Sequence, residues 1–135
     1  MIDKSASIIP GVSLGGIHLG TSLSDLGDDV RLISKHYGIY FYEIGSCISI
    51  SVDCISGLIL KISAHRGYKG LLYGQYALGM SINPLLDNCE WKFDDVFWDG
   101  VMVPVNGDKV YISSLEDPDF EELCDSEIEE ITVFL

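Results

Sequence analysis

The sequence has little positive charge, with eight Lys and Arg residues against 21 Asp and Glu residues and a formal net charge of −13. A protein of that sign repels phosphate backbones, so we expect no direct contact with nucleic acid. Long apolar runs are also missing, and the N-terminal residues lack the apolar segment and cleavage site of a secretory signal. These absences predict a cytoplasmic protein that does not contact a membrane.

Compact catalytic and metal-binding motifs are missing as well. The sequence contains no nucleophile elbow, phosphate loop, H-E-x-x-H or C-x-x-C motif, and its three histidines (His18, His36 and His65) share no register. We therefore predict no catalytic residues, no metal site, no cofactor and no enzymatic activity. The four cysteines are expected to be small buried hydrophobic residues rather than disulfides: Cys47, Cys54, Cys89 and Cys124.

The composition, with 47% apolar and 21% charged residues over 135 positions, is typical of one globular domain spanning residues 1–135. Within it the sequence repeats at an offset of 59 residues, with the shared phrase L-G-x-S-[LI]-x-x-L. The matching pairs are Gly11 and Gly70, Gly15 and Gly74, Leu19 and Leu78, Gly20 and Gly79, Ser22 and Ser81, Leu26 and Leu85, and Asp28 and Asp87.

Each copy reads as a short helix followed by strands. Glycine supplies the turn, serine the N-cap, and the apolar spacing from Leu23 to Ile33 continues the first helix. Alternating apolar residues then predict strands in both halves, ending with one near 129–135. The predicted fold class is α+β, a tandem repeat of two α-then-antiparallel-β units, about 11–66 and 70–135, joined at 67–74 and packed into one body.

The charge lies almost entirely in the second copy. Residues 1–69 hold six acids and six bases, whereas residues 70–135 hold 15 acids and only Lys92 and Lys109. An acidic segment, residues 116–130, has nine acids and no base. Such a run is often a solvated loop, but concentrated like charge destabilises a fold, and a positively charged protein partner would relieve that repulsion.

An aromatic stretch precedes the acidic segment. Trp91, Phe93, Phe97 and Trp98 fall within eight residues, so at least one ring is expected to be exposed, and Trp98 is either an interface anchor or core filling. The neighbouring Asp94 and Asp95 cannot act as a facing catalytic pair, because adjacent strand residues point to opposite faces.

The phrase S-L-G-G-I-H-L-G-T-S-L-S-D-L (Ser13 to Leu26), its echo G-Q-Y-A-L-G-M-S-I-N-P-L-L (Gly74 to Leu86) and the strand S-G-L-I-L-K-I-S resemble immunity proteins of bacterial contact-dependent growth inhibition systems. The helix start is also similar to the tandem-repeat fold of β-lactamase inhibitory protein and of small outer-membrane lipoprotein modules. The first resemblance implies a non-enzymatic inhibitor that binds a cognate toxin domain, usually a nuclease.

On this basis we expect an acidic face to cover the basic active-site cleft of the toxin. The candidate partner-binding residues are Asp94, Asp95, Trp98, Asp99, Glu116, Asp117, Asp119, Glu121 and Glu122. One alternative is a small-molecule binding or catalytic domain, with a pocket between two sheets lined by Tyr40, Tyr42, Tyr73 and Tyr76. Another is an assembly scaffold that pairs through a strand edge.

Overall fold

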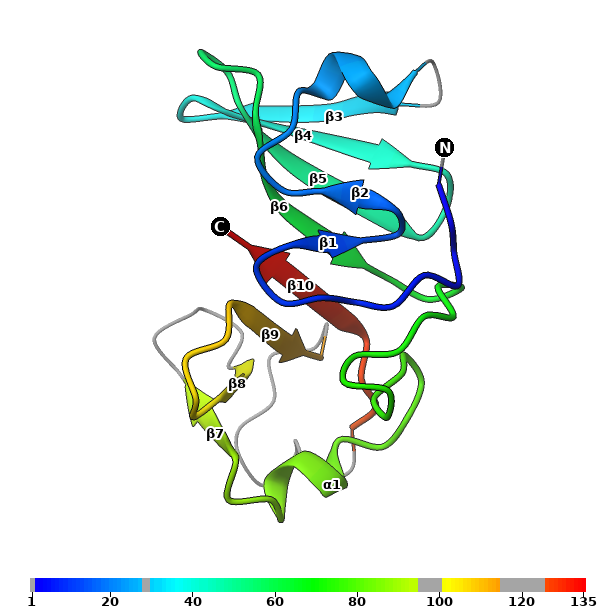
Figure 1. Cartoon of the computed structure of the whole chain (residues 1–135), viewed down its shortest axis with the longest axis vertical. Coiled ribbons are helices and arrows are strands. Elements are labelled where there is room, and N and C mark those ends of the chain that lie inside the picture. The colour runs from blue at the N-terminus through cyan, green and yellow to red at the C-terminus, as the bar shows by residue number, and fades with distance from the viewer. Residues whose placement is uncertain (1, 28–29, 95–100, 115–125) are drawn as a thin grey trace.

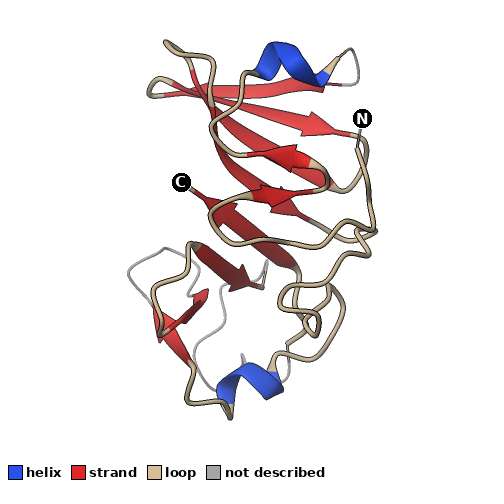
Figure 2. Ribbon diagram, in the orientation of Figure 1, coloured by secondary structure: helices blue, strands red, loops and turns tan. Residues whose placement is uncertain are grey.

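The computed structural model describes residues 2–27, 30–94, 101–114 and 126–135. It is mostly antiparallel sheet, with 47% strand and 7% helix (Figure 2). No helix among the described residues is long and apolar enough to cross a membrane.

The sheet consists of two four-stranded meanders that meet at their last strands (Figure 1). The first meander contains β3 (Val30–His36), β4 (Ile39–Ile44), β5 (Ile48–Asp53) and β6 (Ile59–Ala64). The second contains β7 (Trp91–Asp94), β8 (Val101–Pro104), β9 (Val110–Ser113) and β10 (Glu130–Phe134). Because β6 pairs antiparallel with β10, the order is β3-β4-β5-β6-β10-β9-β8-β7 in one continuous eight-stranded sheet.

The predicted α+β class is wrong, because the helices are single turns. The 3-10 helix η1 (Leu23–Leu26) and the helix α1 (Asn83–Leu86) have four residues each. Ser22 does cap η1, accepting the N–H of Ser24, but Gly27 then turns the chain with a φ of 79°. Val30 and Ile33, predicted as helix, lie in β3.

The repeat itself is visible in the backbone hydrogen bonds that tie each copy to the beginning of the last strand of its meander, at Ile59 in β6 and at Ile128 two residues before β10. In the first copy the N–H of Gly20 donates to the carbonyl of Ile59 at 2.8 Å. In the second copy the N–H of Gly79 donates to the carbonyl of Ile128 at 2.9 Å. The shared L-G-x-S phrase therefore has the same position relative to the end of the meander in both copies.

A second structural match between the two copies corrects the pairing of glycines inferred from the sequence repeat. Residues 9 and 13 form an isolated bridge around a turn, and residues 72 and 76 form the same bridge. Gly11 has a φ of 70° in the first turn, and Gly74 has a φ of 69° in the second. Gly11 therefore matches Gly74, not Gly70, because the first copy holds extra residues in the hairpin of β1 (Ser13–Leu14) and β2 (Ile17–His18).

The two faces of the sheet differ. On β5, Ile48, Ile50 and Val52 are buried, whereas the alternating serines, Ser49 and Ser51, are half-buried on the opposite face. The connecting segments of both copies cover the apolar face, and Figure 1 shows the β1–β2 hairpin crossing the sheet near β6. The opposite face is left polar at the centre of the molecule.

The cysteines follow the prediction only in part. Cys47 is buried, but Cys54 and Cys89 are exposed, and all three are free thiols. Cys124 lies outside the described residues. Exposed positions beside turns have no core to fill, so the expectation of burial fails for those two thiols.

Candidate functional site

Most of the predicted acidic face lies outside the described residues. Asp94 ends β7 and is half-buried. Because β7 is the last strand of the sheet order, Asp94 lies at a sheet edge. The structure does not describe the other candidates, which are Asp95, Trp98, Asp99, Glu116, Asp117, Asp119, Glu121 and Glu122.

The described acids of the second copy are poorly neutralised. In the first copy, Glu43 on β4 pairs with Arg31 on β3 at 3.2 Å, and the other described acids, Asp3, Asp25 and Asp53, have no ion pair among the described residues. Among the described residues of the second copy, Asp87, Glu90, Glu127 and Glu129 have no Lys, Arg or His within 4.0 Å. The second copy thus carries carboxylates that the described part of the fold does not use for ion pairing.

An aromatic pocket of about 530 Å³ lies beside β7 in the second copy. The Trp91 ring lines it and lies edge-to-face with Tyr76 at 5.5 Å between centroids and with Tyr73 at 6.2 Å. Trp91 and Tyr76 are largely buried, whereas Tyr73 is 41% exposed. The lining also includes Glu90, Pro104 and Asn106.

Tyr73 is held at the mouth of this pocket by its backbone and its hydroxyl. Its φ of 55° lies in the left-handed region that a bulky residue rarely adopts. The hydroxyl donates a hydrogen bond to Asp108. Burial, followed by that hydrogen bond and the carboxylate charge, raises the pKa of Tyr73 well above its usual value, so the phenol stays protonated and keeps donating.

The alternative small-molecule site is assembled only in part. Tyr73 and Tyr76 line the aromatic pocket as expected, but Tyr40 and Tyr42 lie on β4 in the other meander and do not. The strands of both meanders form one sheet, so the pocket does not lie between two sheets. Trp91, which sequence reasoning assigned to the aromatic stretch, supplies the third ring instead.

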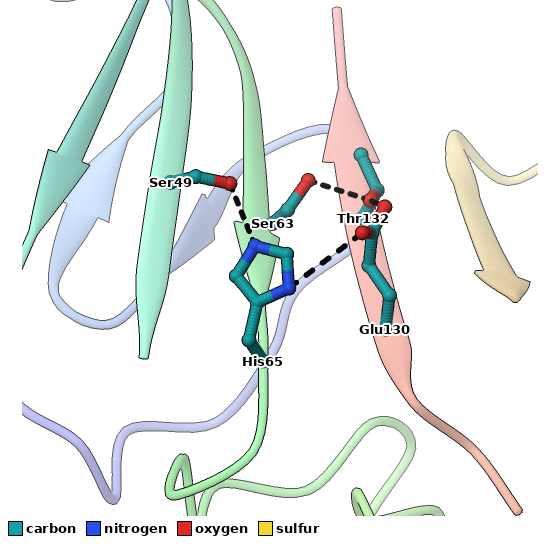
Figure 3. Close-up of polar contacts among 5 residues, drawn as sticks. All are labelled: Ser49, Ser63, His65, Glu130 and Thr132. Atoms are coloured by element: carbon teal, nitrogen blue, oxygen red, sulfur yellow. Dashed lines mark hydrogen bonds and ion pairs between the residues drawn. The ribbon is translucent and has the colours of Figure 1, made fainter. Parts of the chain in front are cut away.

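A polar network crosses the junction of the two meanders on the open face of the sheet (Figure 3). His65 Nε2 lies 2.7 Å from Ser49 Oγ, and His65 Nδ1 lies 3.6 Å from Glu130 Oε2. The hydroxyl of Thr132 donates to Glu130 at 3.0 Å and lies 2.7 Å from Ser63 Oγ. The network therefore joins β5, β6 and β10 through side chains.

The Ser49–His65–Glu130 arrangement has the residue types of an acyl-transfer triad, but its geometry favours a structural role. A Nδ1 to carboxylate distance of 3.6 Å is too long for the hydrogen bond that orients a catalytic histidine. Ser49 lies in the middle of a strand paired on both sides, so nearby backbone N–H groups serve the sheet rather than an oxyanion hole. We interpret the network as a clasp between the meanders.

Sequence reasoning missed this clasp, because its members are far apart in the chain. The only local signal was serine alternating with isoleucine along 48–52, which indicates a sheet with one polar face. The pairing of β6 with β10, which brings Ser63 opposite Thr132, is a tertiary fact that no spacing reveals.

Comparisons with known proteins give no relative of this chain. No family model, no curated protein and no solved structure matches it. The fold, the aromatic pocket and the distribution of charge are therefore the observations on which a function is argued.

Proposed function

We propose that this protein is a non-enzymatic immunity protein, which neutralises a cognate toxin domain by placing acidic residues over the toxin's basic cleft. One observation carries the proposal. Each copy forms a four-stranded meander, and both are held by the same pattern of backbone hydrogen bonds. The first copy nevertheless has no net charge, whereas the second holds the entire net charge of −13. Since the neutral copy builds the same architecture, the fold does not require the charge.

The unneutralised charge also has an energetic consequence. Like charges on one half of a small protein repel one another and destabilise the compact state. A basic protein surface would remove that repulsion on binding, and complementary charge would raise the association rate constant toward about 10⁸–10⁹ M⁻¹s⁻¹ at low salt. The resemblance to immunity proteins and the cytoplasmic location expected from the sequence agree with such a partner.

The proposed contact surface consists of the candidate partner-binding residues that were predicted from the sequence. Asp94 at the β7 edge would lie at its border, with Asp95, Asp99 and the acidic segment supplying the remaining carboxylates and Trp98 the anchor. The partner would be a toxin that itself binds RNA or DNA, so that carboxylates take the place of phosphates.

The test is co-expression with the toxic C-terminal domain of the large secreted effector encoded by a neighbouring gene, followed by pull-down and growth rescue. Reversal of Glu116, Asp119 and Glu122 to Lys should slow association by roughly tenfold or more and reduce its dependence on salt. Trp98→Ala should instead speed dissociation. Failure to form a complex at low salt, together with failure to rescue growth, would overturn the proposal.

A charge reversal in the neutral copy provides the control. Asp25 is exposed and forms no ion pair in the described residues, so Asp25→Lys changes the net charge as much as Glu122→Lys does. If both single reversals slow association equally, then net charge alone steers the partner, and the acidic segment is not the contact surface.

A further inference from the structure

We propose that the aromatic pocket is the receptor for one arginine side chain of the basic partner protein. This proposal rests on the proposed function, and it names a second contact surface that includes none of the carboxylates predicted from the sequence. The pocket combines three aromatic rings with an acidic rim, which is the chemistry that recognises a cation.

The rings supply the first part of the recognition. Trp is the strongest cation–π partner among the aromatic residues, and Trp91 stands between the rings of Tyr73 and Tyr76. The hydrogen bond from the Tyr73 hydroxyl to Asp108 draws negative charge onto the phenol, which strengthens its attraction for a cation. A neutral apolar ligand would gain nothing from that polarisation.

The charges at the rim supply the second part. Glu90 lines the pocket, is exposed and has no basic partner within 4.0 Å in the described residues. None of the described lining residues is Lys or Arg, so no internal cation occupies the site. A cation that enters would find aromatic rings and the Glu90 carboxylate in the same lining.

The internal repeat shows that the two tyrosine rings are not shared by the first copy. The turn at 72–76 repeats the turn at 9–13, so Tyr73 and Tyr76 hold the positions of Pro10 and Ser13. The first copy makes a turn with the same backbone hydrogen bonds and without either ring, although its first corner differs, because Tyr73 has a φ of 55° and a proline cannot adopt that angle. The aromatic residues are thus an addition to the charged copy, where a basic partner is expected to bind.

Arginine fits this combination better than lysine. Its planar guanidinium can stack on an indole while its N–H groups donate to a carboxylate, and it is less strongly hydrated than an ammonium group. A volume of about 530 Å³ is also within the usual range for ligand pockets, so the guanidinium and its alkyl stem can enter together.

The experiment is a titration of the ¹⁵N-labelled protein with N-acetyl-arginine amide, following the indole resonance of Trp91 by NMR. Trp98→Phe assigns the two indole signals, since the chain has only two tryptophans. We expect a saturable shift with a dissociation constant on the order of millimolar, which is the strength expected for a single side chain. N-acetyl-citrulline amide, a neutral analogue of nearly the same shape, should give no saturable shift.

Two variants and a matched control locate the effect. Glu90→Gln should weaken arginine binding by roughly three- to tenfold, because it removes the carboxylate, and Tyr73→Leu should weaken it by about threefold, because it removes one ring. Glu127 is also exposed and unpaired among the described residues, but it does not line the pocket, so Glu127→Gln should leave binding unchanged.

The outcomes separate this proposal from the proposed function. No shift of Trp91 at about 50 mM arginine probe, or an equal shift with the citrulline probe, overturns the arginine receptor. Tighter binding of tetramethylammonium than of the arginine probe would also overturn it and identify a small-molecule site for quaternary ammonium compounds. A positive titration, combined with no complex at low salt and failed growth rescue, would leave the receptor standing and reject the immunity role.

Discussion

The hydroxyl of Tyr68 offers the sharpest test of how the first copy is attached to the connecting segment. Tyr68 is 3% exposed, and its hydroxyl donates to the carbonyl of Ala6 at 2.6 Å and accepts the N–H of Gly15 at 2.8 Å. Tyr68→Phe keeps the ring but leaves both backbone groups without a partner. At about 1–3 kcal/mol for each unsatisfied group, less whatever water recovers, we expect a loss of about 2–4 kcal/mol.

Urea unfolding measures this loss directly. The midpoint should fall while the slope with denaturant stays unchanged, since the buried surface is the same. Tyr37 is 93% exposed, so Tyr37→Phe is the matched control and should change the free energy of unfolding by less than about 0.5 kcal/mol. If Tyr68→Phe behaves like this control, the two hydrogen bonds do not tie residues 6 and 15 to the connecting segment.

The same residue gives a pH dependence with a defined sign. Burial, the largest cause, raises the pKa of Tyr68 above its usual value of 10.0. The native state therefore holds the proton more tightly than the unfolded chain, so this contribution to stability is complete below pH 10 and is lost as the pH rises above it. Tyr68→Phe should reduce the loss of stability above pH 10, and Tyr73, whose pKa is also raised, should account for part of the remainder.

Three further expectations concern packing, the clasp and the charge. Gly70→Ala should cost about 1–3 kcal/mol in urea unfolding, because a Cβ there would collide with the carbonyl oxygen of Ala6 and the ring of Tyr68. Thr132→Val should lower the free energy of unfolding by about 1–2 kcal/mol. A double-mutant cycle with Ser63→Ala should show a coupling energy of roughly 0.5–1.5 kcal/mol, and additive losses would contradict the clasp. Ser51→Ala is the control outside the network. Joint neutralisation of Asp87, Glu90, Glu127 and Glu129 to the corresponding amides should raise the melting temperature at low salt, and no change would mean that their repulsion is negligible.

The strands were predictable wherever one face is buried and the other is not. Along β5 the alternation of isoleucine with serine matches the alternation of burial, and the final strand, β10, closes the sheet as expected. β3 lacks this signature, because six of its seven residues are exposed at the edge of the sheet. Its apolar residues happened to continue the helical spacing from Leu23, although Gly27 ends the 3-10 helix before β3 begins at Val30.

The candidate site was also predictable only in part. Composition alone located the charge in the second copy, because net charge needs no coordinates. The aromatic pocket required the fold, since Trp91 meets Tyr73 and Tyr76 only after the turn at 72–76 packs beside β7. Two of the four tyrosines expected to line a pocket were placed correctly, and the other two were assigned to it because their strand spacing was read as facing a second sheet.

A repeat within one chain provides its own reference for separating what the fold requires from what a partner requires. Both copies must supply a turning glycine, a tether to the closing strand and a buried apolar face, and both do so with matching residues. Charge and the two tyrosine rings are not shared, although the turn that carries Tyr73 and Tyr76 has the same backbone hydrogen bonds as the turn that carries Pro10 and Ser13. The net charge that one copy has, and that the other folds without, is not required by the shared architecture, whereas Tyr76 and Trp91 also fill the core. Here the unshared properties are the negative charge and the two tyrosines of the aromatic pocket, and both agree with the proposal of a positively charged protein partner.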